Sequence, residues 1–334
     1  MSSAAAAARI NRFLYNRILG NFPGEISLAF AYGSGAFKQL GNASENNMLD
    51  FIFVVDDPKE WHRKNLQSNR HHYSALGILG PRTVANVQDR LGAGVYFNTL
   101  VKCEQRLIKY GVVKTSTLVQ ELIHWNNLYL SGRLHKPVHV IKRVQNSALY
   151  NAMRRNQQSA LYTSLLLLPE RFSEEELFTM IAGLSYSGDF RMIIGENKNK
   201  VSNIVKPNLS EFRKFYYSML DTTEHIHWHK KSRTVEQDRS PACLFSHMSS
   251  LPRNLQLQVC RLAGSRSEDH LDVLRRVARD KEGSQYIQRG VQRIVATSSL
   301  SQSIKGIFTA GVTKTLRYSG QKLLKMQQGG AKLR

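Results

Sequence analysis

Phe30-Ala-Tyr-Gly-Ser-Gly-Ala-Phe37 and Met48-Leu-Asp-Phe-Ile-Phe-Val-Val55 are the two stretches that decide the fold of this chain. Ile26 to Tyr32 alternates small and apolar residues, which predicts a strand that runs directly into a glycine-rich loop. Met48 to Val55 is β-branched and aromatic and ends at a turn, which predicts a second strand. We therefore expect a phosphate-binding loop between two buried strands.

The predicted chemical centre consists of this loop and an aspartate at the head of the second strand. Gly33 and Gly35 let backbone N–H groups approach a triphosphate closely, and Ser34 adds a hydroxyl donor. Asp50 would hold a divalent cation, which neutralises charge on the α-phosphorus and on departing pyrophosphate. The pair predicts nucleotidyl transfer. A P-loop is excluded, because the chain contains no G-x-x-x-x-G-K-[ST].

The expected set of acidic residues is incomplete. The general nucleotidyltransferase pattern has a second carboxylate two residues after the first, where this chain has Ile52. Asp56 would lie roughly 20 Å from Asp50 along an extended strand, so it is interpreted as a turn residue. On the next strand, where related enzymes often carry a third acid, stands Lys109. Asp189 is the best candidate for a replacement metal ligand, and the alternative is that it caps a turn.

The rest of the chain predicts a mixed α/β domain over residues 21–145, followed by a smaller domain over 146–222 that is helical or winged-helix-like. Ser173 and Glu176 form a capping box at the start of a helix. Residues 223–300 are interpreted as a variable connection. Three alternating histidines there would allow a metal site, but no carboxylate is placed to complete it, so a solvated loop is favoured. Further strands are expected over 106–113 and 138–141, and helices over 118–130, 147–168, 173–184 and 208–220.

The net charge restricts the class of binding partner, and the cysteine content indicates the redox compartment. Lys and Arg number 47 against 25 Asp and Glu, a formal net charge of +22, which favours nucleic acid, acidic lipid or phosphorylated substrates. Three scattered cysteines suggest neither a disulfide framework nor a cysteine-based zinc site, and therefore a reducing compartment. No apolar run approaches the roughly 18 residues that a membrane-spanning helix needs.

Both ends of the chain allow two interpretations. Residues 1–20 are rich in alanine and arginine and contain no acidic residue, which is typical of a mitochondrial targeting segment. The alternative is that they include the first helix of the folded domain. Residues 301–326 form a basic amphipathic helix, which we expect to lie on an anionic membrane surface; docking on the protein's own core is the alternative. The predicted fold class is thus α/β, with a polymerase-beta-like nucleotidyltransferase domain, a smaller second domain and a C-terminal amphipathic helix.

Several further motifs follow in order along residues 25–220 and reappear in the C-terminal helix: His72-Tyr-Ser, Gly92-Ala-Gly-Val-Tyr-Phe-Asn98, Ile108-Lys-Tyr-Gly-Val112, Gly132-Arg-Leu-His-Lys-Pro-Val138, Leu184-Ser-Tyr-Ser-Gly-Asp-Phe-Arg191, Asn203-Ile-Val205 and Lys305-Gly-Ile-Phe-Thr-Ala-Gly311. Together with the first two stretches, they resemble the motifs of the mitochondrial phosphatidate cytidylyltransferase family. In that family position 52 is also apolar, so Ile52 departs only from the wider superfamily.

The resemblance implies a reaction, a cofactor and a place. CTP and phosphatidic acid would give CDP-diacylglycerol and pyrophosphate, with Mg²⁺ or another divalent cation such as Mn²⁺ or Co²⁺. The enzyme would act peripherally on the matrix side of the mitochondrial inner membrane, in cardiolipin synthesis. The resemblance implies a nucleotide and metal core at Gly33, Ser34 and Asp50, and further site residues at Lys109, Asp189 and Arg191.

The cations also fit the implied acceptor. Phosphatidate is a dianion, which suits Lys109, Arg133, Lys136 and Arg191, while His72 and Tyr73 favour packing over substrate contact. A phosphate monoester with a second pKa near ~6 is already ionised at neutral pH, so it needs no carboxylate to remove a proton. Two alternatives remain: a nucleic-acid nucleotidyltransferase such as a tRNA- or poly(A)-extending enzyme, which predicts an acid at position 52, and a noncatalytic assembly factor for inner-membrane translocases.

Overall fold

The computed structural model describes residues 3–40, 47–194, 199–264 and 268–310. The chain forms two compact units. Unit 1 contains residues 1–118, 138–150 and 301–334, and unit 2 contains residues 119–137 and 151–300. Three helices continue from one unit into the other: α4 (Thr115–His124), α6 (Ser147–Leu167) and α14 (Gly283–Ala310).

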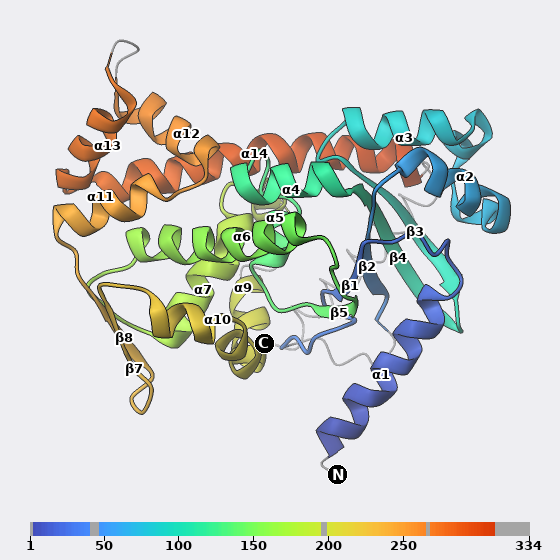
Figure 1. Ribbon diagram of the computed structural model, residues 1–334, viewed down its shortest axis with the longest axis horizontal. Helices are drawn as coiled ribbons and strands as arrows, with labels where there is room; N and C mark the ends of the chain where they lie inside the picture. The colour runs from blue at the N-terminus through green and yellow to red at the C-terminus, as the bar shows by residue number, and fades with distance from the viewer. Residues whose placement is uncertain (1–2, 41–46, 195–198, 265–267, 311–334) are drawn as a thin grey trace. The chain divides into compact units, whose positions relative to one another are not determined.

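Unit 1 is built on a five-stranded mixed sheet in the order β3-β4-β2-β1-β5 (Figure 1). β2 and β4 are parallel, and the other neighbouring strands are antiparallel. The α/β class is confirmed, and four of the strands lie within two residues of their predicted positions. The strands are β1 (Leu28–Tyr32), β2 (Leu49–Val55), β3 (Val95–Cys103), β4 (Arg106–Lys114) and β5 (His139–Lys142).

The fifth strand, β3, was not predicted, because buried polar residues interrupt its apolar pattern. Asn98 is 1% exposed, and its amide donates to the hydroxyl of Tyr110 on β4 at 2.8 Å. The register against β4 shifts between Asn98 and Val101, where Leu100 has a φ of 54°. A bulge and a buried amide hide the period of two on which strand prediction depends.

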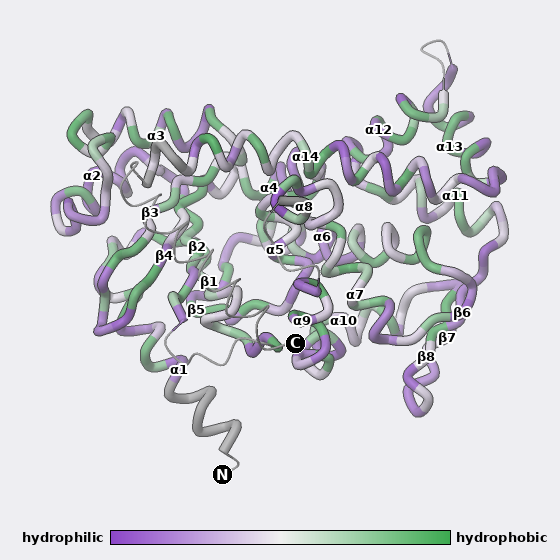
Figure 2. Tube along the Cα trace, turned by 180° about the vertical axis from the view of Figure 1, so that it is seen from behind, coloured by the Kyte–Doolittle hydropathy of each residue, from purple (hydrophilic) through white to green (hydrophobic). Residues whose placement is uncertain are grey.

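The helices of unit 1 pack on this sheet, whose strands are largely hydrophobic (Figure 2). α3 packs against β3 and β4, and α1 contacts β5. Tyr15 and Ile18 of α1 are buried, so the end of the N-terminal segment belongs to the folded domain. Asp57 caps α2, as expected of a turn residue, by accepting from Glu60 N at 3.1 Å. The helices are α1 (Ser3–Leu19), α2 (Pro58–Ser68), η1 (Arg70–His72), η2 (Ala75–Leu79) and α3 (Pro81–Arg90).

His72 and Tyr73 belong to a buried polar network, which confirms that they are packed side chains. The Tyr73 hydroxyl lies 2.8 Å from Asn65 Nδ2 and 2.8 Å from His62 Nδ1. The Tyr110 hydroxyl lies 3.0 Å from Asn65 Nδ2 and 3.0 Å from His72 Nδ1. Because Asn65 donates to both hydroxyls, each tyrosine can donate its own proton to a histidine nitrogen.

Unit 2 combines helices with a three-stranded antiparallel sheet in the order β6-β8-β7. The capping box is confirmed: Ser173 N donates to Glu176 Oε2 at 2.7 Å, and Glu176 N to Ser173 Oγ at 3.2 Å. The elements are α5 (Ser131–Leu134), β6 (Arg171–Ser173), α7 (Glu174–Gly183), η3 (Leu184–Tyr186), α8 (Arg191–Ile194), α9 (Lys200–Val205), η4 (Lys206–Asn208), α10 (Leu209–Thr222), β7 (Ile226–His229), β8 (Thr234–Gln237), α11 (Pro241–Ser249), α12 (Arg253–Ala263) and α13 (His270–Arg279).

Two sequence-based expectations for unit 2 need correction. The segment 223–300 is not a mere connection, because β7, β8 and α11–α14 form there and supply core residues such as Val235, Leu255 and Ile287. The helix expected over 118–130 ends at His124, since Trp125 has a φ of 54° and buries its indole by donating to Asn156 Oδ1 at 2.8 Å.

The described part of the C-terminal helix docks on unit 1. Lys305 is 2% exposed, and its Nζ donates to the carbonyls of Gln88 at 2.8 Å and Leu91 at 2.7 Å, at the end of α3. Gln302 Oε1 accepts from Ala93 N at 2.9 Å. Lys305 is therefore a helix-capping residue and not a membrane contact, contrary to the sequence-based expectation. Residues 311–326 of that predicted helix lie outside the described residues.

Among the helices described, none combines the length and the apolar character that crossing a bilayer requires.

Candidate active site

The glycine-rich loop turns tightly at the end of β1, and two glycines are required there. Gly33 has a φ of +77°, and its carbonyl accepts from Ala36 N at 3.1 Å and Phe37 N at 2.9 Å. A Cβ at Gly35 would lie 2.5 Å from the carbonyl oxygen of Met48, at the entry to β2. A side chain at either position would distort the loop, which explains the sequence Gly-Ser-Gly.

Asp50 lies beside this loop. It is the register partner of Tyr32 in the antiparallel pair of β1 and β2. A Cβ at Gly33 would be 3.2 Å from Asp50 Oδ2, so the carboxylate lies against the first glycine of the loop. The structure thus brings together Gly33, Ser34, Gly35 and Asp50 as the sequence predicts, in a partly exposed position.

Lys109 lies next to Asp50 on the sheet. The two residues are register partners in the parallel pair of β2 and β4, and Lys109 Nζ lies 4.5 Å from the centroid of the Phe97 ring. Ile52, at the position where the general nucleotidyltransferase pattern has a second acid, is fully buried. A Cβ at Gly111 would lie 2.9 Å from Ile52 Cδ1, so this position is part of the core, where a carboxylate would be desolvated.

His139 on β5 contacts Ala36 and Phe37 of the loop, and the sequence did not single it out as a site residue. Its ring stacks on Phe37, with centroids 4.3 Å apart and an interplanar angle of 8°. His139 Nε2 lies 3.1 Å from the carbonyl oxygen of Ala36, to which it can donate. In the sequence His139 only fell within an expected strand and directly after a family motif, because a contact between β5 and a distant loop leaves no local pattern.

Replacing His139 with alanine is expected to raise the KM for a nucleotide substrate about 10-fold, with a smaller effect on kcat, because one hydrogen bond and one aromatic contact that position the loop are lost. Steady-state kinetics of His139→Ala and His139→Gln would show it; glutamine, which can still donate, should recover part of the loss. Val140→Ala, on the exposed face of the same strand, is the control. Equal KM values for His139→Ala and the control would contradict this role.

Four predicted site residues lie in unit 2, and three of them are cations near one another. Lys136 Nζ donates to Ser185 Oγ at 3.0 Å and lies 5.1 Å from the centroid of the Tyr186 ring. Burial, assisted by the nearby charge of Arg133, lowers the pKa of Lys136 to about 7. Arg133 is also close enough to Arg191 to affect its pKa. The Gly132 and Leu184 motifs thus form one cationic cluster: Arg133, Lys136 and Arg191.

Asp189 lies beside this cluster and engages Arg191. Its Oδ1 accepts from Arg191 N at 2.9 Å and Nε at 2.9 Å, and its Oδ2 accepts from Arg191 Nη2 at 2.5 Å. The carboxylate is 3% exposed, which gives the arginine a fixed orientation. Its role as a metal ligand stays a prediction. In the part of the chain that the structure describes, no group of three His, Cys, Asp or Glu side chains is arranged to hold a metal ion.

Comparison with known proteins identifies the family. A family model described as mitochondrial phosphatidate cytidylyltransferase matches residues 15–325. The chain belongs to this family. It is 49% identical over 320 residues to the mitochondrial phosphatidate cytidylyltransferase of Danio rerio, covering 94% of this chain and 95% of that protein. The Xenopus laevis relative is 50% identical, covering 94% of each chain, and that of Drosophila melanogaster 42%, covering 93% and 98%.

Proposed function

We propose that this chain transfers the cytidylyl group of CTP to phosphatidic acid, giving CDP-diacylglycerol and pyrophosphate. The observation that carries the proposal is the family match over residues 15–325 together with the arrangement of Gly33, Asp50 and Lys109 on the three inner strands of the sheet and the loop between them. The same arrangement supports a nucleotidyltransferase fold for unit 1, and the helices with a three-stranded sheet support a winged-helix-like fold for unit 2.

The loop and Asp50 would bind the triphosphate. We assign the triphosphate to backbone N–H groups of this loop and to the Ser34 hydroxyl, because glycine-rich turns let phosphates come close to the backbone. Asp50 fits a Mg²⁺ ion, because this ion is commonly held by one or two carboxylates together with substrate phosphates and water. When bound, the metal supplies charge neutralisation at the phosphates.

The acceptor is a phosphate, which explains why the site has few acids. At neutral pH phosphatidate is mostly a dianion, so its oxygen can attack the α-phosphorus without a general base. The reaction forms a P–O bond to the cytidylyl group and breaks the bond to pyrophosphate. We assign the phosphatidate phosphate to Lys136, Arg133 and Arg191, and we assign to Lys109 a contact with the negative charge that develops during transfer.

We further infer a peripheral enzyme on the matrix side of the mitochondrial inner membrane, which acts in cardiolipin synthesis. The names of the relatives, which include the word mitochondrial, support the compartment. The formal charge of +22 favours an anionic lipid surface. The basic segment 301–326 is the proposed contact with this surface, except for Lys305, which is buried against α3.

The experiment uses the purified full-length chain with Mg²⁺, labelled CTP and either vesicles containing phosphatidic acid or tRNA. We expect CDP-diacylglycerol and one equivalent of pyrophosphate with the vesicles, and no labelled RNA. Labelled RNA would favour the nucleic-acid enzyme. No product with Mg²⁺, Mn²⁺ or Co²⁺ would contradict the proposed activity and favour a noncatalytic assembly factor.

A further inference from the structure

Unit 2 contains a cavity of about 830 Å³ that no motif of the sequence pointed to. Its walls come from α7, η3, α9 and the start of α10, and one side of α14 contributes Val291. The volume lies in the range of sites for small molecules, roughly 300–1,000 Å³. The apolar part of its wall includes Leu168, Met180, Leu184, Val201, Leu209 and Val291.

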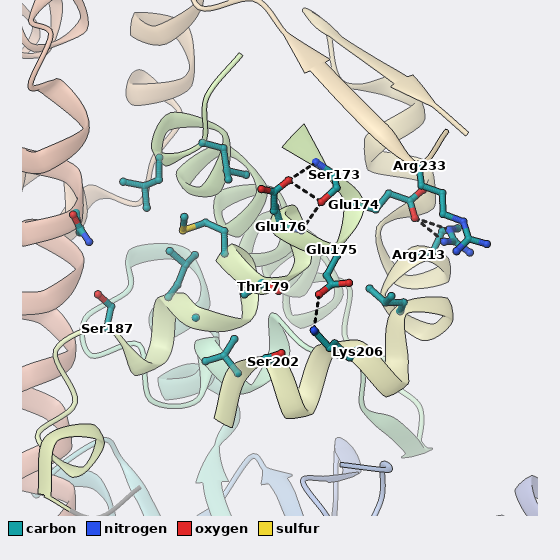
Figure 3. A pocket seen from close by; sticks show the side chains of 18 of the residues that line it. Ser173, Glu174, Glu175, Glu176, Thr179, Ser187, Ser202, Lys206, Arg213 and Arg233 are labelled. Carbon is teal, nitrogen blue, oxygen red and sulfur yellow. Dashed lines mark hydrogen bonds and ion pairs between the residues drawn. The ribbon is translucent and has the colours of Figure 1, made fainter. Parts of the chain in front are cut away.

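The acidic side chains of the wall are already engaged. Glu174 accepts from Arg213 Nε at 3.0 Å, and Glu175 lies 3.5 Å from Lys206 Nζ. Glu176 closes the capping box with Ser173. These pairs are drawn as dashed lines in Figure 3, where the Glu174–Arg213 pair lies at the side with Arg233. Because these carboxylates are satisfied within the protein, an apolar ligand would leave none of them unpaired.

The cavity adjoins the cationic cluster through η3. Leu184 and Ser187 line the cavity, whereas Ser185 and Tyr186, between them in sequence, contact Lys136. Figure 3 shows Ser187 at the side of the cavity opposite Arg213 and Arg233. The cations and the cavity therefore both lie next to residues 184–187, so an anionic amphiphile could place its phosphate at the cations and its apolar chain in the cavity.

We propose that this cavity takes an acyl chain of phosphatidate while its phosphate is bound by Lys136, Arg133 and Arg191. The inference rests on the proposed function, and it adds where in the chain the lipid is recognised. Every methylene buried in such a cavity contributes about 0.8 kcal/mol, or about fourfold in affinity. The cavity therefore makes the enzyme selective for phosphatidates with long acyl chains over water-soluble phosphate esters.

The test narrows the cavity and compares two lipids. Thr179→Trp and Val201→Trp place an indole in the cavity from partly exposed helix positions, where the change is tolerated better than in the core. For each variant we expect the KM for dipalmitoyl-phosphatidate in mixed micelles to rise about 10-fold or more, since several methylenes lose their contacts. The KM values for dibutyryl-phosphatidate and for CTP should change less than about twofold. Lys214→Trp, at an exposed position of α10, is the matched control.

Two results separate this inference from the proposed function. If wild-type protein makes CDP-diacylglycerol but neither variant alters the KM for the long-chain lipid, the cavity does not hold the acyl chain, although the function stands. Should the wild type form no product, photo-crosslinking decides. Dipalmitoyl-phosphatidate with a diazirine in its acyl chain should label α7 or α9 in the wild type and lose this labelling in Val201→Trp. Labelling elsewhere only would overturn the inference.

Discussion

Asp50→Asn is expected to lower kcat by about 10³-fold or more, because the substitution removes the carboxylate assigned to the divalent cation and leaves the side chain's shape intact. The carboxylate lies against Gly33 and beside Lys109, so it is the acid placed where the triphosphate would bind. Initial rates of pyrophosphate release, measured over a Mg²⁺ titration, would show the loss. Additional metal should not restore the rate, because the ligand itself is missing.

The control is an aspartate near the other end of the same strand. Asp56 accepts from Ser27 Oγ at 3.0 Å, away from the loop, so Asp56→Asn should reduce thermal stability and leave the Mg²⁺ dependence unchanged. Asp50→Asn should unfold at nearly the wild-type temperature. Residual activity within about 10-fold of wild type in a folded Asp50→Asn variant would show that another residue holds the metal.

The sheet and the loop could be predicted because their information is local. β1 and β2 are runs of apolar residues, and Gly33 and Gly35 are required by a turn and a close approach within the stretch that these two strands span. β3 was not predicted, because its buried Asn98 is stabilised by a hydrogen bond to Tyr110 on another strand, which the local sequence does not reveal. His139 was missed for a similar reason, since its partner Phe37 lies far away in sequence.

In unit 2 the sequence named candidate site residues, but it could not predict the contacts among them. Gly132 lies in the short helix α5, where a Cβ would come within 2.2 Å of Ser185 Cβ. The glycine therefore permits the close approach of two motifs that are about 50 residues apart, and one sequence alone does not show such a pairing. Lys136, in the same motif as Gly132, donates its hydrogen bond to Ser185 at this approach.

The second prediction with a large expected effect concerns the contribution of Lys136 to the KM for phosphatidate and the pH dependence of that KM. We expect Lys136→Met to raise the KM for phosphatidate about 10- to 100-fold at pH 7, the value of a charge-assisted hydrogen bond to phosphate. In the free protein the pKa of Lys136 is about 7, lowered mainly by burial and further by Arg133. Above this pH the lysine is neutral before phosphatidate binds, so binding a dianion requires uptake of a proton.

The wild-type KM for phosphatidate should therefore be lowest between about pH 6, where the phosphate becomes a dianion, and about pH 7. Above about pH 7 the KM should rise up to tenfold per pH unit. Lys136→Arg should lose the rise, because arginine stays charged. Lys136→Met should lose it as well, at a higher KM throughout. Glu121 and Lys305 also have pKa values near 7, raised and lowered respectively by burial, and both remain in these variants. A rise that persists in Lys136→Met would thus belong to one of them, and Lys136 would not bind the phosphate as a cation.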